Sequence, residues 1–188
     1  MATSSTISAL IKNDHASIKK AYQNYTLAED NLDEQQRWAN EFRWELARHI
    51  VAEELILYPA LQKYLDTEGK KLAHQNRAEH QEIKDLLHKL ETASVSNPDY
   101  RTTFDQIVDF FTYHIAGEEE NDYPKLEKAI TAEQNDSLAR SYDRTKMFAP
   151  TRSHPNAPNT PPFETVVGLI TAPIDKLQDL FDKFPDNK

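Results

Sequence analysis

The stretch HIVAEELILYP at residues 49–59 returns as HIAGEEENDYP at residues 114–124, so the template H-I-x-x-E-E-x-x-x-Y-P occurs twice, 65 positions apart. The same offset relates the Asp-His pair at 14–15 to the Glu-His pair at 79–80. Each half therefore carries an acid-His pair and, 34 residues after that histidine, a His-x-x-x-Glu motif. Two copies of so long a period predict a pseudo-symmetric pair of helical hairpins rather than a solenoid.

The composition favours long helices over sheets. The chain of 188 residues has only three glycines, and its first 140 residues contain three prolines. Cysteine is absent, which excludes disulfides, thiolate metal sites and cysteine nucleophiles. A net charge of −9 without a basic cluster argues against nucleic acid as a partner. With neither a signal-peptide core nor a membrane-spanning apolar run, we expect a soluble cytoplasmic protein and no membrane partner.

Apolar residues recur at helical spacing in four segments, which predicts helices near 4–27, 33–65, 69–93 and 98–129. The expected fold is all-α, an up-down-up-down four-helix bundle with a C-terminal helical extension. Each predicted helix carries a histidine on its apolar stripe, and two of them add a glutamate one turn later. These six residues are His15, His49, Glu53, His80, His114 and Glu118.

Polar groups on apolar stripes need a partner, because an isolated buried carboxylate costs several kcal/mol. A His and a Glu four positions apart lie about 40° apart around a helix and roughly 6 Å apart along it, so both can reach one point. The twofold repeat predicts two metal ions, each with two histidines and with carboxylates between them. Imidazole and carboxylate suit iron, and also manganese or zinc. Hydrogen-bonded core histidines and surface i,i+4 pairs explain the repeated inward pattern poorly.

These motifs resemble the hemerythrin-like family, also called HHE cation-binding domains, over about residues 5–130. The resemblance implies a four-helix bundle with two non-haem iron ions bridged by oxo, hydroxo or water. It also implies that two histidines of each half bind one iron and that two glutamates bridge the pair. The implied ligands are His15 with His49, His80 with His114, and Glu53 with Glu118 as bridges.

One position departs from the oxygen-carrying members of that family. They have a further histidine one turn before the position of His80, where this chain has Asn76. His74 lies about 120° around the helix from His80 and would reach the site only through a local irregularity. We therefore expect an open or water-filled position on the His80 metal. Reversible oxygen carriage is thereby disfavoured.

An open position suits a protein that binds or activates dioxygen or a related small oxidant. Two alternatives stay open at this point. One is an oxygenase or oxidase that acts on an organic substrate; the other is a non-catalytic iron or oxygen sensor or a metal-storage protein. The residues do not decide whether the protein is an enzyme.

Acidic residues beside the six candidates give weaker predictions. Asp14 and Glu79 lie about 100° from their neighbouring histidines, so we expect them at most to hydrogen-bond to ligands. The role of Glu54 is open, and Glu119 and Glu120 are expected in solvent. His88 and His154 have no partner pattern and are also expected at the surface.

The residues that flank each candidate glutamate also allow two interpretations. The Tyr-Pro pairs at 58–59 and 123–124 either kink the helices and hydrogen-bond near the site, or close the end of the bundle. Ala52 and Gly117 are small either to leave room for a ligand or to let helices pack closely, with packing slightly favoured.

The duplication defines a bundle domain at 1–130 and an extension at 131–188. Five prolines make residues 148–162 an extended polar connection. Residues 163–184 then predict an amphipathic helix interrupted at Pro173. We expect its apolar stripe to pack on the bundle, with a protein partner or a second copy as the alternative; its acidic residues disfavour a membrane surface. The stripe consists of Phe163, Val166, Val167, Ile170, Ile174, Leu177, Phe181 and Phe184.

Overall fold

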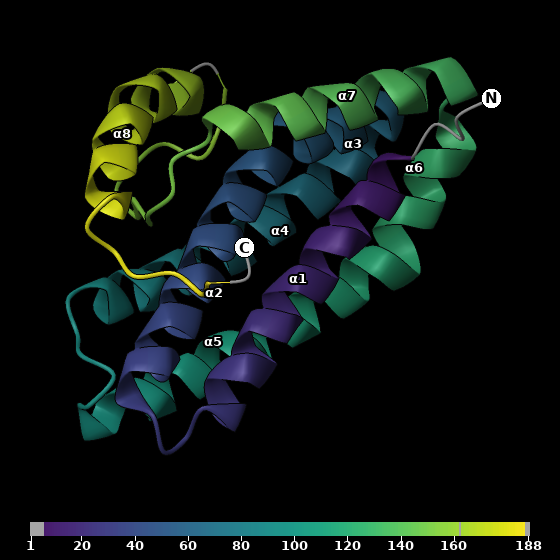
Figure 1. The fold of residues 1–188 in the computed structure, drawn as a ribbon. Coiled ribbons are helices and arrows are strands. Elements are labelled where there is room, and N and C mark those ends of the chain that lie inside the picture. The colour runs from purple at the N-terminus through teal and green to yellow at the C-terminus, as the bar shows by residue number, and fades with distance from the viewer. Residues whose placement is uncertain (1–5, 162, 187–188) are drawn as a thin grey trace.

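The computed structural model describes residues 6–161 and 163–186. Four long helical rods lie side by side and form a bundle (Figure 1). The rods are α1 (Ile7–Leu27), α2 (Leu32–Ala52) continued through η1 (Glu53–Leu57) into α3 (Tyr58–Tyr64), α4 (Asp66–Glu91), and α5 (Pro98–Gly117) continued through η2 (Glu118–Asp122) into α6 (Tyr123–Ala129). The predicted all-α four-helix bundle is confirmed.

The two rods that contain the repeated motif are not broken at proline. Each passes through a π-helical turn, η1 or η2, directly before its Tyr-Pro pair. The amide of Tyr58 bonds to the carbonyl of Glu53, and the amide of Tyr123 bonds to that of Glu118. These bonds span five residues instead of four, so each rod takes up one extra residue just before the proline. The rods therefore continue to Tyr64 and Ala129.

Side chains that accept backbone hydrogen bonds fix where the rods begin. Thr6 accepts from the amide of Ala9 at the start of α1, and Asn31 accepts from Glu34 at the start of α2. Asn97 caps α5, where Pro98 occupies the first helical position and lacks only an amide that would be unpaired. Each cap of this kind contributes about 1 kcal/mol to stability.

Helices α3 and α4 are joined by a very tight turn. Asp66 begins α4 with a φ of 48°, in the left-handed region. One turn later, a Cβ built on Gly69 would lie 1.9 Å from the carbonyl oxygen of Leu61. Only glycine lets the two backbones approach this closely.

The interior consists of two apolar clusters with a buried polar layer between them. The larger cluster contains Ile18, Phe42, Leu46, Ile83, Phe104, Ile107 and Phe111. The smaller contains Ile7, Ile11, Leu57, Tyr58, Leu61, Tyr123 and Tyr142. The four rods therefore pack above and below a polar layer, and that layer holds the candidate residues.

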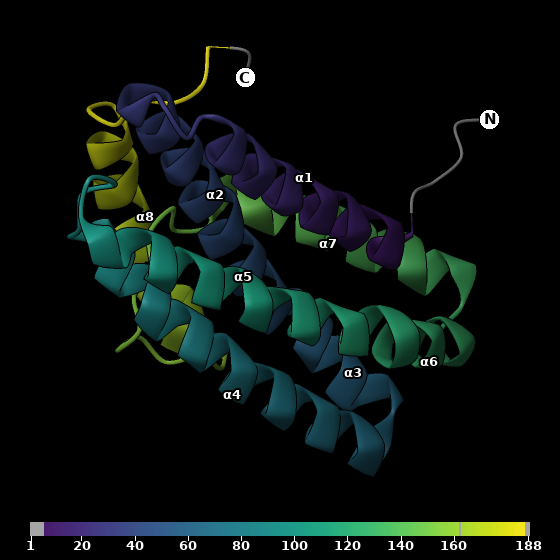
Figure 2. The same cartoon turned by 90° about the horizontal axis from the view of Figure 1, so that it is seen from below.

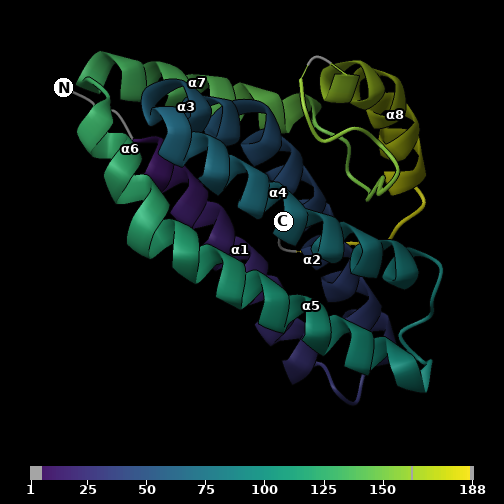
Figure 3. The same cartoon turned by 180° about the vertical axis from the view of Figure 1, so that it is seen from behind.

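A fifth helix, α7 (Ala132–Phe148), runs along the outside of the bundle (Figures 2 and 3). It packs on α1, α2 and the η1 turn, and its start is fixed by a reciprocal capping box between Thr131 and Gln134. Its inner face is buried at Ala139 and Tyr142. Helix α7 therefore adds to the bundle and does not stand apart from it.

Residues 149–161 contain no regular helix or strand and are held along α4 by hydrogen bonds. Arg77 donates to the carbonyl of Asn159 at 2.8 Å, and the hydroxyl of Ser153 donates to the carbonyl of Lys84 at 2.7 Å. Beyond them, Asp175 of α8 (Phe163–Asp179) accepts from the amide of Thr151 at 3.1 Å. The proline-rich connection thus brings α8 back toward the bundle.

Among the described residues, the apolar stripe packs on the bundle at Phe184, which is half-buried beside Trp44 of α2, but not along α8 itself, where that expectation was wrong. Ile170, Ile174, Leu177 and Phe181 are all more than half exposed, whereas Asp175 is buried. Polar contacts decide this orientation, because Asp175 is drawn inward by two backbone amides and by His154.

Three stripe residues, Phe163, Val166 and Val167, lie outside the residues whose side chains the structure describes. Docking of the stripe to a protein partner or a second copy stays a prediction. Across the described part of the chain, none of the helices combines the length and apolar character that crossing a membrane requires.

We expect Gly69→Ala to lower the free energy of unfolding by several kcal/mol, because its methyl group would overlap the Leu61 carbonyl. Gly117→Ala is the matched control. A Cβ there meets no atom within 4 Å, so that change is expected to stabilise the helix by up to about 1 kcal/mol. Urea unfolding of metal-free protein measures both, and equal stability of the two variants would contradict the close approach of α3 and α4.

His154 was expected at the surface without a partner, but its Nε2 lies 3.0 Å from Oδ2 of Asp175. The hydrogen bond to Asp175 raises the pKa of His154 above its usual 6.5. The contact therefore stabilises α8 fully below the ordinary histidine pKa and is lost as pH rises through the raised value. Hydrogen exchange of α8 amides should be slower at about pH 5.5 than at about pH 8 after correction for intrinsic rates. His154→Gln should abolish this difference and His88→Gln, at an exposed site, should keep it.

Candidate metal centre

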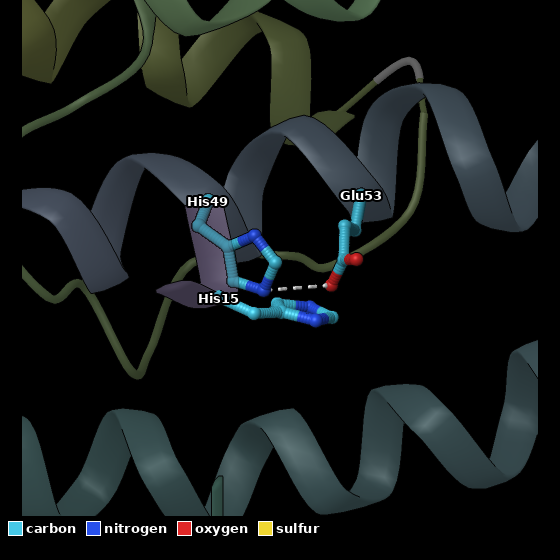
Figure 4. A group of neighbouring side chains, drawn as sticks. All are labelled: His15, His49 and Glu53. Atoms are coloured by element: carbon cyan, nitrogen blue, oxygen red, sulfur yellow. Dashed lines mark ion pairs between the residues drawn. The ribbon is translucent and has the colours of Figure 1, made fainter. Parts of the chain in front are cut away.

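The structure brings all six candidate residues together in the polar layer. His15 comes from α1, His49 from α2, His80 from α4 and His114 from α5, while the glutamates begin the two π turns. Every one of them is buried. Figure 4 shows His15 of α1 pointing toward His49 and Glu53, which lie one turn apart on the neighbouring rod. The duplicated motif therefore converges on one interior site.

Glu53 lies between the two halves of the site. Its Oε2 is 3.3 Å from Nε2 of His49 and 3.4 Å from Nε2 of His80. Within the described residues, two groups could each hold an ion with ligand atoms within 4.8 Å of one another: His15, His49 and Glu53, and Glu53, His80 and His114. Glu53 belongs to both groups, which is the geometry a bridging carboxylate requires.

Glu118 occupies the matching place on the other side. Its Oε1 lies 3.5 Å from Nε2 of His114, and its Oε2 lies 3.9 Å from Nε2 of His15. Each carboxylate therefore faces one histidine from each half of the chain, as the twofold repeat predicts.

The π turns bring Tyr58 and Tyr123 onto the face that carries the glutamates. In a regular α-helix, residues five apart point about 140° away from each other. Here Tyr123 donates to Oε2 of Glu118 at 2.8 Å, five residues earlier, and Tyr58 donates to Oε1 of the same carboxylate at 3.2 Å. Of the two interpretations of the Tyr-Pro pairs, the first therefore holds for the tyrosines: they hydrogen-bond within the site.

Burial governs the electrostatics of the carboxylates. It raises the pKa of Glu53 well above the ordinary carboxyl value, and the neighbouring Glu118 raises it further. Burial also raises the pKa of Glu118, against the lowering effect of His114 and Tyr123. Two carboxylates this close cannot both be ionised without positive charge between them.

Three of the four imidazoles are held in the neutral form that binds metals. Burial lowers the pKa of His15 to about 3, and of His49 and His80 to about 4, so these rings are neutral at pH 7. Burial opposes protonation of His114 too, but Glu118 and Glu79 raise its pKa. The raised pKa of His114 thus shows that the carboxylates of this layer attract positive charge.

Two of the imidazoles also present free lone pairs. Among the described residues, Nε2 of His15 and Nε2 of His49 are buried without a hydrogen-bond partner. Buried polar atoms are rarely left unpaired in native structures. Unpaired imidazole nitrogens beside unneutralised carboxylates form a donor set that fits a divalent transition-metal ion.

The far side of each ring is held by an acidic residue or a tyrosine. Nδ1 of three histidines bonds directly to a carboxylate: His15 to Glu119 at 2.7 Å, His80 to Glu54 at 3.2 Å, and His114 to Glu79 at 2.7 Å. Nδ1 of His49 instead contacts the hydroxyl of Tyr142 at 3.1 Å. Such contacts orient a metal-binding imidazole and fix its tautomer.

Several of these partners were missed or misplaced from sequence. Glu119 was expected in solvent, yet it supports His15 from a partly exposed position. The sequence does not assign a role to Glu54, which the structure buries fully between His80 and Lys84. The signal was present, because both halves repeat an acid before the first histidine and a second glutamate after the ligand glutamate. Tyr142 had no such signal, because it lies beyond the duplicated region.

Of the two residues considered beside His80, Asn76 faces the site and His74 is exposed. The Asn76 amide donates to Oδ2 of Asp122 at 2.8 Å and lies 3.5 Å from Oε1 of Glu118. A cavity of about 360 Å³ opens here, lined by residues that include Asn76, Glu79, His114, Gly117, Asp122 and Lys125. The second half of the site is thus reached from outside.

Gly117 and Ala52 have different roles despite their matching positions. No atom lies within 4 Å of a Cβ built on Gly117, which lines the cavity, so its small size leaves room there. Ala52 is fully buried in the smaller apolar cluster, as close packing requires. The expectation of packing is correct for Ala52 and wrong for Gly117.

Comparisons with known proteins agree with this geometry. Residues 6–126 match the family described as hemerythrin HHE cation binding domain. A hemerythrin-like protein of Schizosaccharomyces pombe is 46% identical over 179 residues, 95% of this chain and 88% of that protein. A DNA nickase of Nostoc sp. is 23% identical over 140 residues, 74% of this chain and 39% of that protein.

A solved structure shares the fold. The crystal structure of a hemerythrin HHE cation binding domain-containing protein from Mycobacterium kansasii superposes with a TM-score of 0.66 at 24% identity. The match covers 76% of this chain and 86% of that chain.

Glu53→Gln should have opposite effects in metal-free and metal-loaded protein. In metal-free protein, burial raises the pKa of Glu53 well above 4.5, the ordinary value for a glutamate. The folded state is therefore destabilised by this residue as pH rises above 4.5. Glutamine cannot ionise and causes no such loss. The variant should therefore be more stable than the parent at about pH 8, and this gain should shrink toward about pH 4.5. With divalent metal added, the order should reverse, because the parent gains binding energy that the variant lacks.

Urea unfolding with and without chelator measures both effects. Glu29→Gln, at an exposed site, is the control and should change neither. A metal-free Glu53→Gln protein that is less stable than the parent at every pH would contradict the electrostatic account.

Proposed function

Because the chain belongs to the hemerythrin HHE cation-binding domain family, we propose that it holds two non-haem iron ions and binds or activates dioxygen or a related small oxidant. When bound, an iron pair supplies electrons and an open coordination position. The residues of the chain hold the ions, orient the ligands and limit what reaches them.

The proposed ligand set follows the repeat. His15 and His49 would hold one ion, and His80 and His114 the other, with Glu53 and Glu118 between them. The neutral imidazoles and the two adjacent carboxylates support this assignment, because the set lacks only positive charge. Manganese and zinc suit the same donor types. The choice of iron therefore rests on family membership and not on the geometry of the site.

The cavity beside His114 is the observation that carries the choice of a small oxidant. A further histidine at position 76 would lie in the same helical row as His80, and Asn76 instead bonds to Asp122. The cavity reaches Asn76 and His114 while the six candidate ligands stay buried. Water-sized molecules can therefore approach the second half of the site from one side.

The charge of the lining favours neutral molecules over anions. Glu79, Glu120 and Asp122 line the cavity together with one cation, Lys125. Dioxygen and hydrogen peroxide carry no charge at pH 7 and meet no electrostatic barrier there, whereas an anion does.

An oxygenase or oxidase of an organic substrate is the second candidate, and the size of the cavity favours it. A cavity of about 360 Å³ is within the range of small-molecule sites. Such sites are mainly apolar and enclosed, whereas this one has several acids and amides in its lining and faces solvent. A small uncharged oxidant therefore fits better than a large apolar substrate.

Iron-replete expression followed by metal analysis and optical spectroscopy tests the proposal. We expect about two iron ions per chain and absorption bands that change when peroxide or oxygen is added. Replacing His80 with alanine should lower the iron content by about half or more. Fewer than about one iron per chain in the parent protein, or iron that stays unreactive toward both oxidants, would contradict the proposal.

Filling the cavity tests the route by which the oxidant arrives. Gly117→Leu places a side chain in the open space and should slow the reaction of iron-loaded protein with peroxide several-fold at unchanged iron content. Gly117→Ala adds one methyl group and should change the rate little. Equal rates for the parent and Gly117→Leu would exclude this cavity as the route.

A further inference from the structure

Helix α7 lies beyond residues 6–126, the part of the chain that matches the family, yet it reaches the metal centre. It packs on α1, α2 and η1, which carry His15, His49 and Glu53. The residue that enters the centre is Tyr142, which is 1% exposed. Its hydroxyl lies behind the ring of His49, on the side away from Glu53.

The hydrogen bonds around this hydroxyl have one consistent direction. The Tyr142 O–H donates to Oδ2 of Asp14 at 2.7 Å. Nδ1 of His49 lies 3.1 Å from the hydroxyl oxygen of Tyr142. Asp14 accepts a second contact from Nζ of Lys146 at 2.7 Å, also from α7. Since the hydroxyl has one proton and gives it to Asp14, its oxygen accepts from His49 Nδ1–H. That tautomer leaves the Nε2 lone pair of His49 free toward Glu53.

The second half of the chain achieves the same result without a tyrosine. Glu79, the counterpart of Asp14 in the repeat, contacts Nδ1 of His114 directly at 2.7 Å. Asp14 is one methylene shorter, and its carboxylate stays 3.8 Å from Nδ1 of His49. The hydroxyl of Tyr142 fills the gap that the shorter acid leaves. The repeat is therefore completed in its first half by a residue from outside it.

We propose that Tyr142 is a positioning residue of the metal centre, and that α7 is an integral part of the metal-binding domain, whose boundary lies after residue 148 and not at 130. Tyr142 holds His49 in the tautomer and orientation that bind a cation, through a hydroxyl inserted between His49 and Asp14. This inference rests on the proposed role of His49 as a ligand.

Tyr142→Phe tests the inference, because it keeps the ring and removes only the hydroxyl. We expect its affinity for Zn²⁺, measured by competition with a chelator, to fall by about 10–100-fold, as for other hydrogen-bond partners of metal ligands. Zn²⁺ has no redox chemistry, so the measurement is independent of any reaction with oxidants. The absorption bands of the iron-loaded variant should also shift.

A rescue separates positioning from mere packing. In the Tyr142→Phe background, Asp14→Glu supplies an acid of the length found at Glu79, able to reach Nδ1 of His49 directly. The double variant should therefore recover most of the lost affinity. Tyr100→Phe is the matched control, since Tyr100 is buried and its hydroxyl has no partner among the described residues. It should leave the affinity for Zn²⁺ unchanged.

The outcomes are distinct. If Tyr142→Phe lowers the stability of metal-free protein but leaves Zn²⁺ affinity at the parent value, Tyr142 only fills the core and the inference is wrong. Failure of Asp14→Glu to restore any affinity would also overturn it. If the parent protein binds neither iron nor Zn²⁺, the proposed function itself fails, and this result is seen before any variant is made.

Discussion

Glu53 and Glu118 meet in the interior with apolar clusters on both sides, and their proximity is the constraint on which the rest of the centre depends. The hydroxyls of Tyr58 and Tyr123 donate to Glu118 and approach Glu53 at 3.4–3.5 Å, but they bring no positive charge. The histidines around them are kept neutral by burial, apart from His114. A cation between the carboxylates is the simplest way to make this layer stable, because it neutralises both acids and satisfies the free imidazole nitrogens.

Hydrogen bonds behind the candidate ligands cross between the two halves of the repeat. Glu54 of the first half supports His80 of the second, and Glu119 of the second supports His15 of the first. By contrast, Glu79 supports His114 within its own half, as Asp14 supports His49 through Tyr142. The pseudo-twofold axis thus relates the supports as well as the candidate ligands. The symmetry is broken at Asp14, the shorter counterpart of Glu79. There Tyr142 of the extension completes the contact with His49.

The sequence was sufficient to predict the four rods and the meeting of the six candidates, since both follow from helical periodicity and an exact offset. It could not reveal that the π turns bring Tyr58 and Tyr123 to the carboxylates, because a helix with one extra residue has no distinct apolar pattern. Tyr142 was equally hidden, as its role depends on where α7 docks. The α8 stripe was misjudged because amphipathicity assumes an apolar inner face, and buried Asp175 reverses it.

The crossed supports also bear on the order of events during folding. His15 and Glu119 are 104 positions apart in the chain, so their contact closes one of the longest loops in the bundle. Closing such a loop costs entropy that only the finished packing of the rods repays. A nascent chain that has released only its first hairpin lacks Glu119 and the whole second histidine pair. Assembly of the complete donor set is accordingly a late step, which follows synthesis of the second hairpin and cannot nucleate the first.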